Sequence, residues 1–266
     1  MTWRSFLVIL WGTLLLAGCS TNRPPAPDAA PSPVASPVSE ARPTAIPAPP
    51  SASNNPSQAN VGAARRGGKL VRLFRDPPTL DPHLTTDTAS GNFIVEIFGG
   101  LVTIDRDLQI VPDLAENWDV SSGGRVYTFH IRPDARFHSG RPVTAKDVQW
   151  SLERAADPAT RSPIASQYLG DIVGVNDKLA GLAASIKGVR VIGDRSVEIT
   201  IDAPKSYFLA KLSYPTGFVL DRETIEADPA NWLRHPNGTG PFRLREYIKG
   251  ERLILERNDR YYRGTP

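Results

Sequence analysis

Histidine and cysteine are the residue types best suited to metal binding and nucleophilic chemistry, and this 266-residue chain has four histidines and one cysteine. A single cysteine can form neither an intramolecular disulfide nor a cysteine-rich zinc site. The chain also has no His-x-x-x-His spacing and no Gly-x-Ser-x-Gly, Walker or Gly-x-Gly-x-x-Gly motif. His130 and His138 could be considered as metal ligands, but no carboxylate pattern accompanies them, so structural roles are favoured. The sequence therefore indicates no enzyme, no metal and no cofactor.

The single cysteine, Cys19, ends the run Leu16-Ala17-Gly18-Cys19. A charged start at Met1–Arg4 and an apolar segment at Phe6–Leu16 precede it. This segment is too short to span a membrane, but it fits a signal peptide. The run resembles the bacterial lipobox, in which the chain is cut before a cysteine that carries a diacylglycerol. We expect residues 1–19 to be a lipoprotein signal peptide, with the mature protein attached to a membrane through Cys19. An uncleaved anchor helix is the alternative, and it too would place the rest of the chain outside the membrane.

Residues 20–67 consist mostly of proline, alanine, serine, asparagine and glycine, without apolar periodicity. Such a segment buries too little apolar surface to offset the entropy lost on ordering. Its prolines favour extended polyproline II. We therefore predict a disordered tether that holds a folded domain away from a lipid surface; a proline-rich ligand for SH3-like domains is the alternative.

The folded part is expected to begin near Gly68 and to mix helices and strands without a regular βαβ repeat. Alternation and turn residues predict strands at 69–74, 101–104 and 127–132, a short helical turn at 112–118, and hairpins at 189–201 and 242–256. Apolar periodicity predicts a helix over 88–98 and a short helix over 207–212. A further helix is expected to begin at Thr144, with Asp147 completing a capping box and Val148, Leu152 and Ala155 on one face.

From Gly68 to Pro266 the chain carries several motifs in order, namely Thr79-Leu80-Asp81-Pro82-His83, Phe98-Gly99-Gly100-Leu101, Pro112-Asp113-Leu114-Ala115-Glu116-Asn117-Trp118, Tyr127-Thr128-Phe129-His130-Ile131-Arg132, Ala135 through Val148, Gly238-Thr239-Gly240-Pro241-Phe242, and Leu255-Glu256-Arg257-Asn258 leading to Tyr261-Tyr262. Their order and intervals resemble the bacterial extracellular solute-binding proteins of family 5, the peptide and nickel receptors of ABC importers.

The resemblance implies a mixed α/β fold of the type II periplasmic-binding-protein class, in which two lobes joined by a hinge close over a ligand. Residues 68–93 and 188–266 would form part of lobe I, and residues 94–187 would form an extra subdomain. Members of the family are considerably longer than this chain. We therefore expect the first lobe and the extra subdomain, corresponding to the N-terminal half, with the second lobe missing.

The resemblance also places the loop at 85–89 beside the ligand, so that Thr86, Asp87, Thr88 and Ala89 become candidate ligand contacts. A helix N-cap at Asp87 or Thr88 is the favoured alternative, and both roles can hold together.

Three further residues are candidate ligand contacts. Phe98 could touch ligand side chains, although a core aromatic is favoured. Tyr214 and Thr216 could line the cleft or the hinge, and an ordinary turn explains them equally well.

The expected function is that of a lipid-anchored, extracytoplasmic subunit that captures oligopeptides for the membrane permease of an ABC importer, without chemistry on the solute. The expected partners are an oligopeptide or another small solute, the permease subunits and the membrane. The net charge of +3 is mild and the basic residues are scattered, so no nucleic acid is expected. A peptide, nickel chelate or sugar would fit the same motifs. The alternatives are an envelope protein that uses a truncated fold as a partner surface, and an exported hydrolase with catalytic groups from distant loops.

Overall fold

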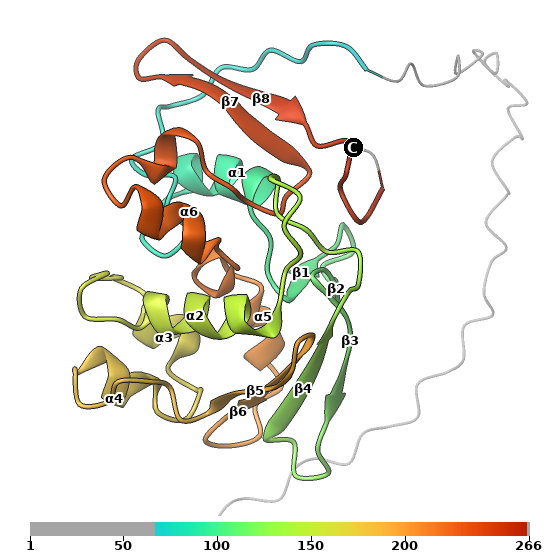
Figure 1. Ribbon diagram of the computed structural model, residues 1–266, viewed down its shortest axis with the longest axis vertical. Coiled ribbons are helices and arrows are strands. Elements are labelled where there is room, and N and C mark those ends of the chain that lie inside the picture. Colours follow the sequence, from blue (N-terminus) through green and yellow to red (C-terminus); the bar gives the residue numbers. More distant parts are fainter. Residues whose placement is uncertain (1–66, 265–266) are drawn as a thin grey trace, which may run out of the picture. The chain divides into compact units, whose positions relative to one another are not determined.

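The computed structural model describes residues 67–264, so the predicted signal peptide, Cys19 and the tether up to residue 66 lie outside the described residues. Figure 1 shows the arrangement of the elements. The helices are α1 (Thr88–Ile97), α2 (Ala145–Ala155), α3 (Ala165–Leu169), α4 (Val175–Leu179), α5 (Phe208–Leu212) and α6 (Arg222–Ala227), with 3-10 helices η1 (Pro215–Gly217) and η2 (Trp232–Arg234). The strands are β1 (Val102–Ile104), β2 (Ile110–Pro112), β3 (Ala115–Val120), β4 (Val126–Ile131), β5 (Val189–Gly193), β6 (Ser196–Thr200), β7 (Phe242–Ile248) and β8 (Arg252–Arg257).

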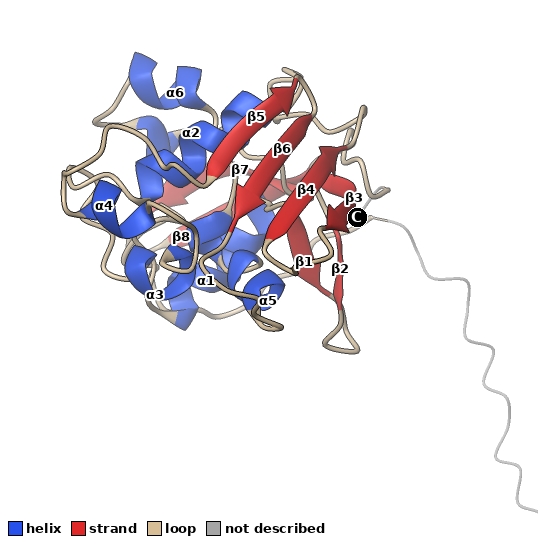
Figure 2. Ribbon diagram, turned by 90° about the horizontal axis from the view of Figure 1, so that it is seen from below, coloured by secondary structure: helices blue, strands red, loops and turns tan. Residues whose placement is uncertain are grey.

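Four antiparallel strands form one sheet in the order β3-β4-β6-β5. Along the central β4, Tyr127, Phe129 and Ile131 are buried, whereas Thr128 and His130 are only half-buried. This period of two confirms the predicted strand, because successive side chains of a strand point to opposite faces of its sheet. The buried face contributes to the larger of two hydrophobic clusters, and Figure 2 shows the sheet with helices beside it.

α2 begins with the capping box that the sequence predicts. The backbone amide of Asp147 donates to Thr144 Oγ1 at 3.4 Å, and that of Thr144 donates to Asp147 Oδ2 at 2.8 Å. Two amides that lack helical partners are thereby satisfied. Val148, Leu152 and Ala155 are buried as predicted, in a helix that packs against β5 and β6.

A second hydrophobic cluster joins α1 to the β7–β8 hairpin. Ile94 and Ile97 of α1 are fully buried and share this cluster with Trp232 and with Leu244 of β7. Figure 1 shows the hairpin lying across α1. The hairpin therefore fixes the helix whose N-terminus carries several of the predicted ligand contacts.

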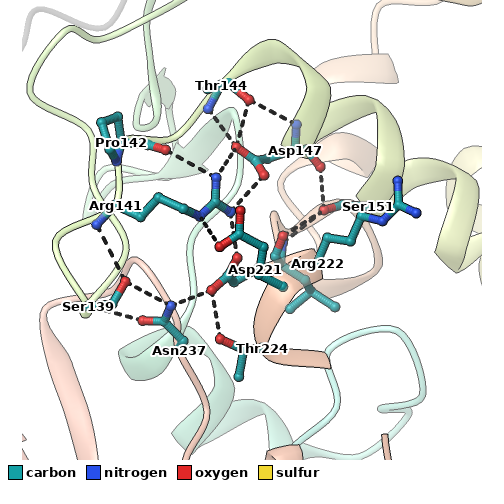
Figure 3. Close-up of polar contacts among 12 residues, drawn as sticks. Ser139, Arg141, Pro142, Thr144, Asp147, Ser151, Asp221, Arg222, Thr224 and Asn237 are labelled. Atoms are coloured by element: carbon teal, nitrogen blue, oxygen red, sulfur yellow. Dashed lines mark hydrogen bonds and ion pairs between the residues drawn. The ribbon is translucent and has the colours of Figure 1, made fainter. Parts of the chain in front are cut away.

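Arg141 links the start of α2 to the segment around α6 (Figure 3). Its guanidinium donates to both oxygens of Asp147, at 2.8 and 3.2 Å, and to Asp221 Oδ1 at 2.5 Å. Burial alone would raise the pKa of Asp221, but hydrogen bonds from Thr224, Arg141 and Asn237 lower it overall. Both carboxylates are buried, so Arg141 supplies the counter-charge that makes their burial tolerable.

Two predicted elements are wrong. Lys69–Phe74 forms no strand, and the side chains of Leu70 and Leu73 are 82% and 101% exposed. An alternating sequence becomes a strand only where a neighbour accepts its backbone hydrogen bonds, and none of the described strands forms backbone hydrogen bonds with this segment. Instead of a helical turn, Pro112–Trp118 contributes to β2 and β3, because these residues pair with β1 and β4. The sequence analysis also missed α6.

The four-stranded sheet bears on the predicted domain boundaries. It joins β3 and β4, from the predicted extra subdomain, to β5 and β6, which the prediction assigned to lobe I. A boundary between residues 187 and 188 would separate strands of one sheet, so a division after β6 fits the topology better. The assignment of 68–93 and 188–266 to lobe I and of 94–187 to the subdomain stays a prediction.

Candidate ligand-binding surface

The loop that leads into α1 and the first turn of that helix carry four of the predicted ligand contacts. Thr86 and Thr88 are exposed, whereas Asp87 and Ala89 are half-buried. Asp87 is the N-cap of α1, because its Oδ1 accepts a hydrogen bond from the backbone amide of Ser90 at 2.8 Å. The capping interpretation is thus confirmed. Oδ2 of Asp87 accepts no hydrogen bond from any described residue, so the cap leaves one carboxylate oxygen available.

Two tyrosines from different segments stack beside this loop. The rings of Tyr168, in α3, and Tyr214, after α5, lie 3.9 Å apart between centroids at an angle of 13°. Both side chains are half-buried. Burial raises the pKa of the Tyr214 hydroxyl, and Tyr168 and the carboxylate of Asp87 add to this rise, so Asp87 lies within electrostatic range of Tyr214. We call the group formed by Thr86, Asp87, Tyr168 and Tyr214 the tyrosine surface.

The 3-10 helix η1 holds the walls of the tyrosine surface together. It follows Tyr214 directly, and α1, α3 and α5 all pack against it. The backbone amide of Gly217 donates to the carbonyl oxygen of Tyr214 at 2.8 Å. Tyr168 was missed by the sequence analysis, because a lone aromatic in a weak helix gives no signal of its partner 46 positions away along the chain.

The remaining two predicted contacts, Phe98 and Thr216, have buried side chains. Phe98 is 2% exposed and makes an edge-on contact with Trp232, with ring centroids 6.4 Å apart. Thr216 is fully buried, and its hydroxyl has no hydrogen-bond partner among the described residues. Phe98 thus has the core position that the sequence analysis favoured, and a ligand contact for either residue stays a prediction.

A hollow of about 420 Å³ lies at the other end of α1, and Phe98 is the one predicted contact that lines it. Its polar wall contains Asp113, which accepts a hydrogen bond from the Tyr262 hydroxyl at 2.9 Å and lies 3.5 Å from the Arg263 guanidinium. Burial raises the pKa of Asp113 despite these partners. The Asp113 carboxylate is thus already bonded to protein groups, and the Ser213 hydroxyl, which also lines the hollow, donates to the carbonyl oxygen of Ala210 at 2.8 Å.

The two histidines considered as metal ligands bind protein groups instead. His130 Nε2 lies 3.0 Å from Asp119 Oδ2 on the sheet surface. His138 Nε2 lies 3.1 Å from the carbonyl oxygen of Gly240, so the ring ties two loops together. The structural roles that the sequence favoured for these histidines fit these contacts. Among the described residues no group of three His, Cys, Asp or Glu side chains could hold a metal ion, and no helix is long and apolar enough to cross a membrane.

Comparison with known proteins gives a consistent result. The family described as bacterial extracellular solute-binding proteins, family 5 Middle, matches residues 109–266, which is more than half of the chain. The chain is 35% identical over 192 residues to the periplasmic oligopeptide-binding protein OppA of Escherichia coli (strain K12), covering 70% of this chain and 35% of OppA. It is 32% identical over 192 residues to the probable deoxycholate-binding periplasmic protein YgiS of the same organism, covering 70% of this chain and 36% of YgiS.

A solved structure extends the likeness to the fold. It is a periplasmic oligopeptide-binding protein/oligopeptide ABC transporter (OppAIV) from Borrelia burgdorferi, which matches with a TM-score of 0.68 and 30% identity over 71% of this chain and 39% of that chain. This confirms the predicted mixed α/β fold of a type II periplasmic binding protein. The matched proteins are binding proteins rather than enzymes, which confirms that expectation as well. The chain spans little more than a third of the length of these relatives.

Proposed function

This chain belongs to the bacterial extracellular solute-binding proteins of family 5, and from that premise we propose that it binds a peptide on the tyrosine surface. In this proposal the bound peptide passes to the membrane subunits of an ABC importer without being chemically changed. The names of OppA and of the Borrelia burgdorferi protein support peptide as the solute class and an ABC transporter as the destination.

The stacked tyrosines beside a free carboxylate oxygen carry this proposal. A peptide presents N–H donors, a terminal ammonium, planar amides and apolar side chains. Oδ2 of Asp87 can accept from the ammonium or from an N–H group. The exposed parts of the Tyr168–Tyr214 pair offer an aromatic face for amide planes or side chains. The hydroxyl of Thr86 both donates and accepts, so it suits a peptide backbone.

YgiS supports a second candidate solute. The name of this relative gives deoxycholate as the probable ligand, and a flat steroid would also pack against an aromatic face. Deoxycholate, however, carries a negative charge, which Asp87 would repel. Peptide is therefore the better match to the tyrosine surface.

Titration of the 15N-labelled full chain with trialanine, followed by NMR, tests the peptide proposal. We expect shifts of the amides at 85–89 and around Tyr168 and Tyr214. Tyr214→Leu should weaken binding severalfold, because the aromatic stacking is lost. Tyr207→Leu is the matched control, because Tyr207 is a 49% exposed tyrosine outside the tyrosine surface and its loss should leave the titration unchanged.

Two outcomes would contradict the peptide proposal. One is a response to deoxycholate at the tyrosine surface together with none to trialanine. The other is a response to trialanine confined to a different region, such as the hollow beside Asp113.

We also propose that a diacylglycerol on Cys19 anchors the protein at the cell envelope, on the extracytoplasmic side. The run Leu16-Ala17-Gly18-Cys19 supports this, and the tether at 20–67 would then keep the folded part near a permease at high local concentration. Growth with a labelled fatty acid should label the wild-type protein in the membrane fraction and leave Cys19→Ser unlabelled. Equal labelling of the two would contradict the anchor.

A further inference from the structure

Three side chains outside the tyrosine surface form a buried polar cluster. Asp81 is 2% exposed and His83 is fully buried, while the side chain of Arg154, which lies on α2, is 16% exposed. Asp81 and His83 belong to the loop that ends at the α1 N-cap. Burying such a cluster is costly unless every member has a hydrogen-bond partner. The hydrogen bonds of the three side chains therefore indicate which parts of the fold the cluster holds together.

Arg154 binds both loop residues at once. Its guanidinium donates to Asp81 Oδ1 at 3.1 Å and Oδ2 at 2.7 Å, and it also lies 2.9 Å from His83 Nδ1. Arginine has only donors, so Nδ1 must accept and the ring proton lies on Nε2. Nε2 in turn lies 3.2 Å from the carbonyl oxygen of Phe218, to which it donates. The neutral Nε2–H form of His83 is the state that satisfies both contacts.

His83 thereby touches each of the three segments that build the tyrosine surface. Its own loop continues to Asp87. Its carbonyl oxygen accepts a hydrogen bond from Ser162 Oγ at 2.6 Å, and residue 162 lies six positions before Tyr168. Its imidazole binds Phe218, which directly follows η1 and lies four positions after Tyr214. One buried residue therefore connects three segments that are distant in sequence, through its ring and its backbone carbonyl oxygen.

We propose that Asp81, His83 and Arg154 are positioning residues that hold these three segments in register for the ligand, an inference that rests on the proposed function. None of the three needs to touch the ligand. Arg154 fixes the loop before α1 by donating to both carboxylate oxygens of Asp81, and it sets the tautomer of His83. His83 then fixes the segments that contain Ser162 and Phe218. A lysine would keep the charge at position 154, but its single ammonium lacks the planar fork that engages Asp81 and His83 together.

Arg141 provides a matched control for general destabilisation. It too is a partly buried arginine that bridges distant segments through two carboxylates. Unlike Arg154, it makes none of its polar contacts with residues 79–88, 162–168 or 214–218. Arg141→Lys should therefore weaken the fold without a selective effect on the tyrosine surface.

The first test uses the unaltered full chain. A long-range 1H–15N NMR spectrum of the histidine rings at pH 7 should show a neutral His83 with its proton on Nε2. A proton on Nδ1, or a fully protonated ring, would overturn the proposal. This measurement decides the central contact even where a substituted chain does not fold.

The second test compares Arg154→Lys and Asp81→Asn with Arg141→Lys by amide hydrogen exchange and by trialanine titration. Arg154→Lys and Asp81→Asn should speed amide exchange at least tenfold in residues 79–88, 162–168 and 214–218, measured relative to any change in β4 and β6. Both substitutions should also weaken trialanine binding at least tenfold. Arg141→Lys should change exchange uniformly.

The possible outcomes separate this proposal from the proposed function. A uniform change in Arg154→Lys, matching that of Arg141→Lys, would overturn the positioning role. Selective loosening together with no trialanine response in the wild-type chain would support the positioning role and refute the peptide proposal instead.

Discussion

Lowering the pH from 8 to 5 should destabilise this protein, because two of its histidines resist protonation in the folded state. Burial lowers the pKa of His83 from 6.5 to about 4, with the nearby Arg154 adding to the effect and Asp81 opposing it. Burial likewise lowers the pKa of His138 from 6.5 to about 4. His83 is fully buried and His138 half-buried, so both contribute to the pH dependence.

The sign and size follow from proton linkage. Well above pH 6.5, as at pH 8, both histidines are neutral whether the chain is folded or unfolded, and their contribution to stability is complete. As the pH falls from 6.5 towards 4, the unfolded chain binds protons that the folded chain does not bind, so that contribution is lost. At pH 5 the loss is about 2 kcal/mol for His83, which is large against a typical total of about 5–15 kcal/mol. Burial raises the pKa of Asp113, Glu96 and Glu153, and these groups oppose the trend.

Urea unfolding at pH 8, 6.5 and 5 measures the effect, and substitution isolates it from the carboxylates. His83→Gln should reduce the stability difference between pH 8 and pH 5 by about 2 kcal/mol. His138→Gln should reduce that difference as well. The comparison uses the change in the free energy of unfolding between pH 8 and pH 5, so any loss of stability that a substitution causes equally at both pH values cancels. The same pH dependence in the wild type and in His83→Gln would refute the reasoning.

Four further substitutions test the packing by urea unfolding, or by circular dichroism where the chain does not fold. Phe129→Ala should cost about 3–5 kcal/mol, because this fully buried ring lies in one of the two central strands of the sheet; a cost below about 1 kcal/mol would contradict that burial. Thr144→Ala should cost about 1 kcal/mol through loss of the α2 cap, and helix content by circular dichroism should fall with it. Gly238→Ala should prevent folding, because a Cβ at this position would lie 1.9 Å from the Ile97 carbonyl oxygen. Gly91→Ala should stabilise α1 by about 0.5–1 kcal/mol, because a Cβ there would meet nothing within 4 Å. Similar effects of the two alanines would contradict this geometry.

The parts of the fold that the sequence predicts are those determined over a few residues. The capping box of Thr144 and Asp147 spans one turn, and the alternation of β4 spans six residues. Lys69–Phe74 fails for the opposite reason, because its alternation is equally clear but its strand partner would have to come from elsewhere. Pro112–Trp118 fails because distant backbone groups at Gly100 and Leu101 bond to it and override its local preference.

The candidate site was predictable to the same limited extent. The loop at 85–89 was predicted from the family resemblance, and the N-cap role of Asp87 follows from residue type. Tyr168 and the contacts of Arg154 could not be anticipated. The partners lie 46 positions apart for the stacked tyrosines and 73 for Arg154 and Asp81, and no periodicity links residues so far apart along the chain.

The strength of peptide binding provides the sharpest check on the assignment of the site. A solvent-exposed ion pair contributes about 0.2–1 kcal/mol, and an aromatic contact about 0.5–1.5 kcal/mol beyond its area. Their sum falls short of the roughly 4.1 kcal/mol that a millimolar Kd requires, so the open tyrosine surface should bind trialanine with a Kd of about 1 mM or weaker. Tighter binding in this fold class requires closure, which buries the ligand between two faces and removes water. A micromolar Kd for the unaided chain would therefore mean that the peptide lies in an enclosed site, such as the hollow beside Asp113, and not on the tyrosine surface.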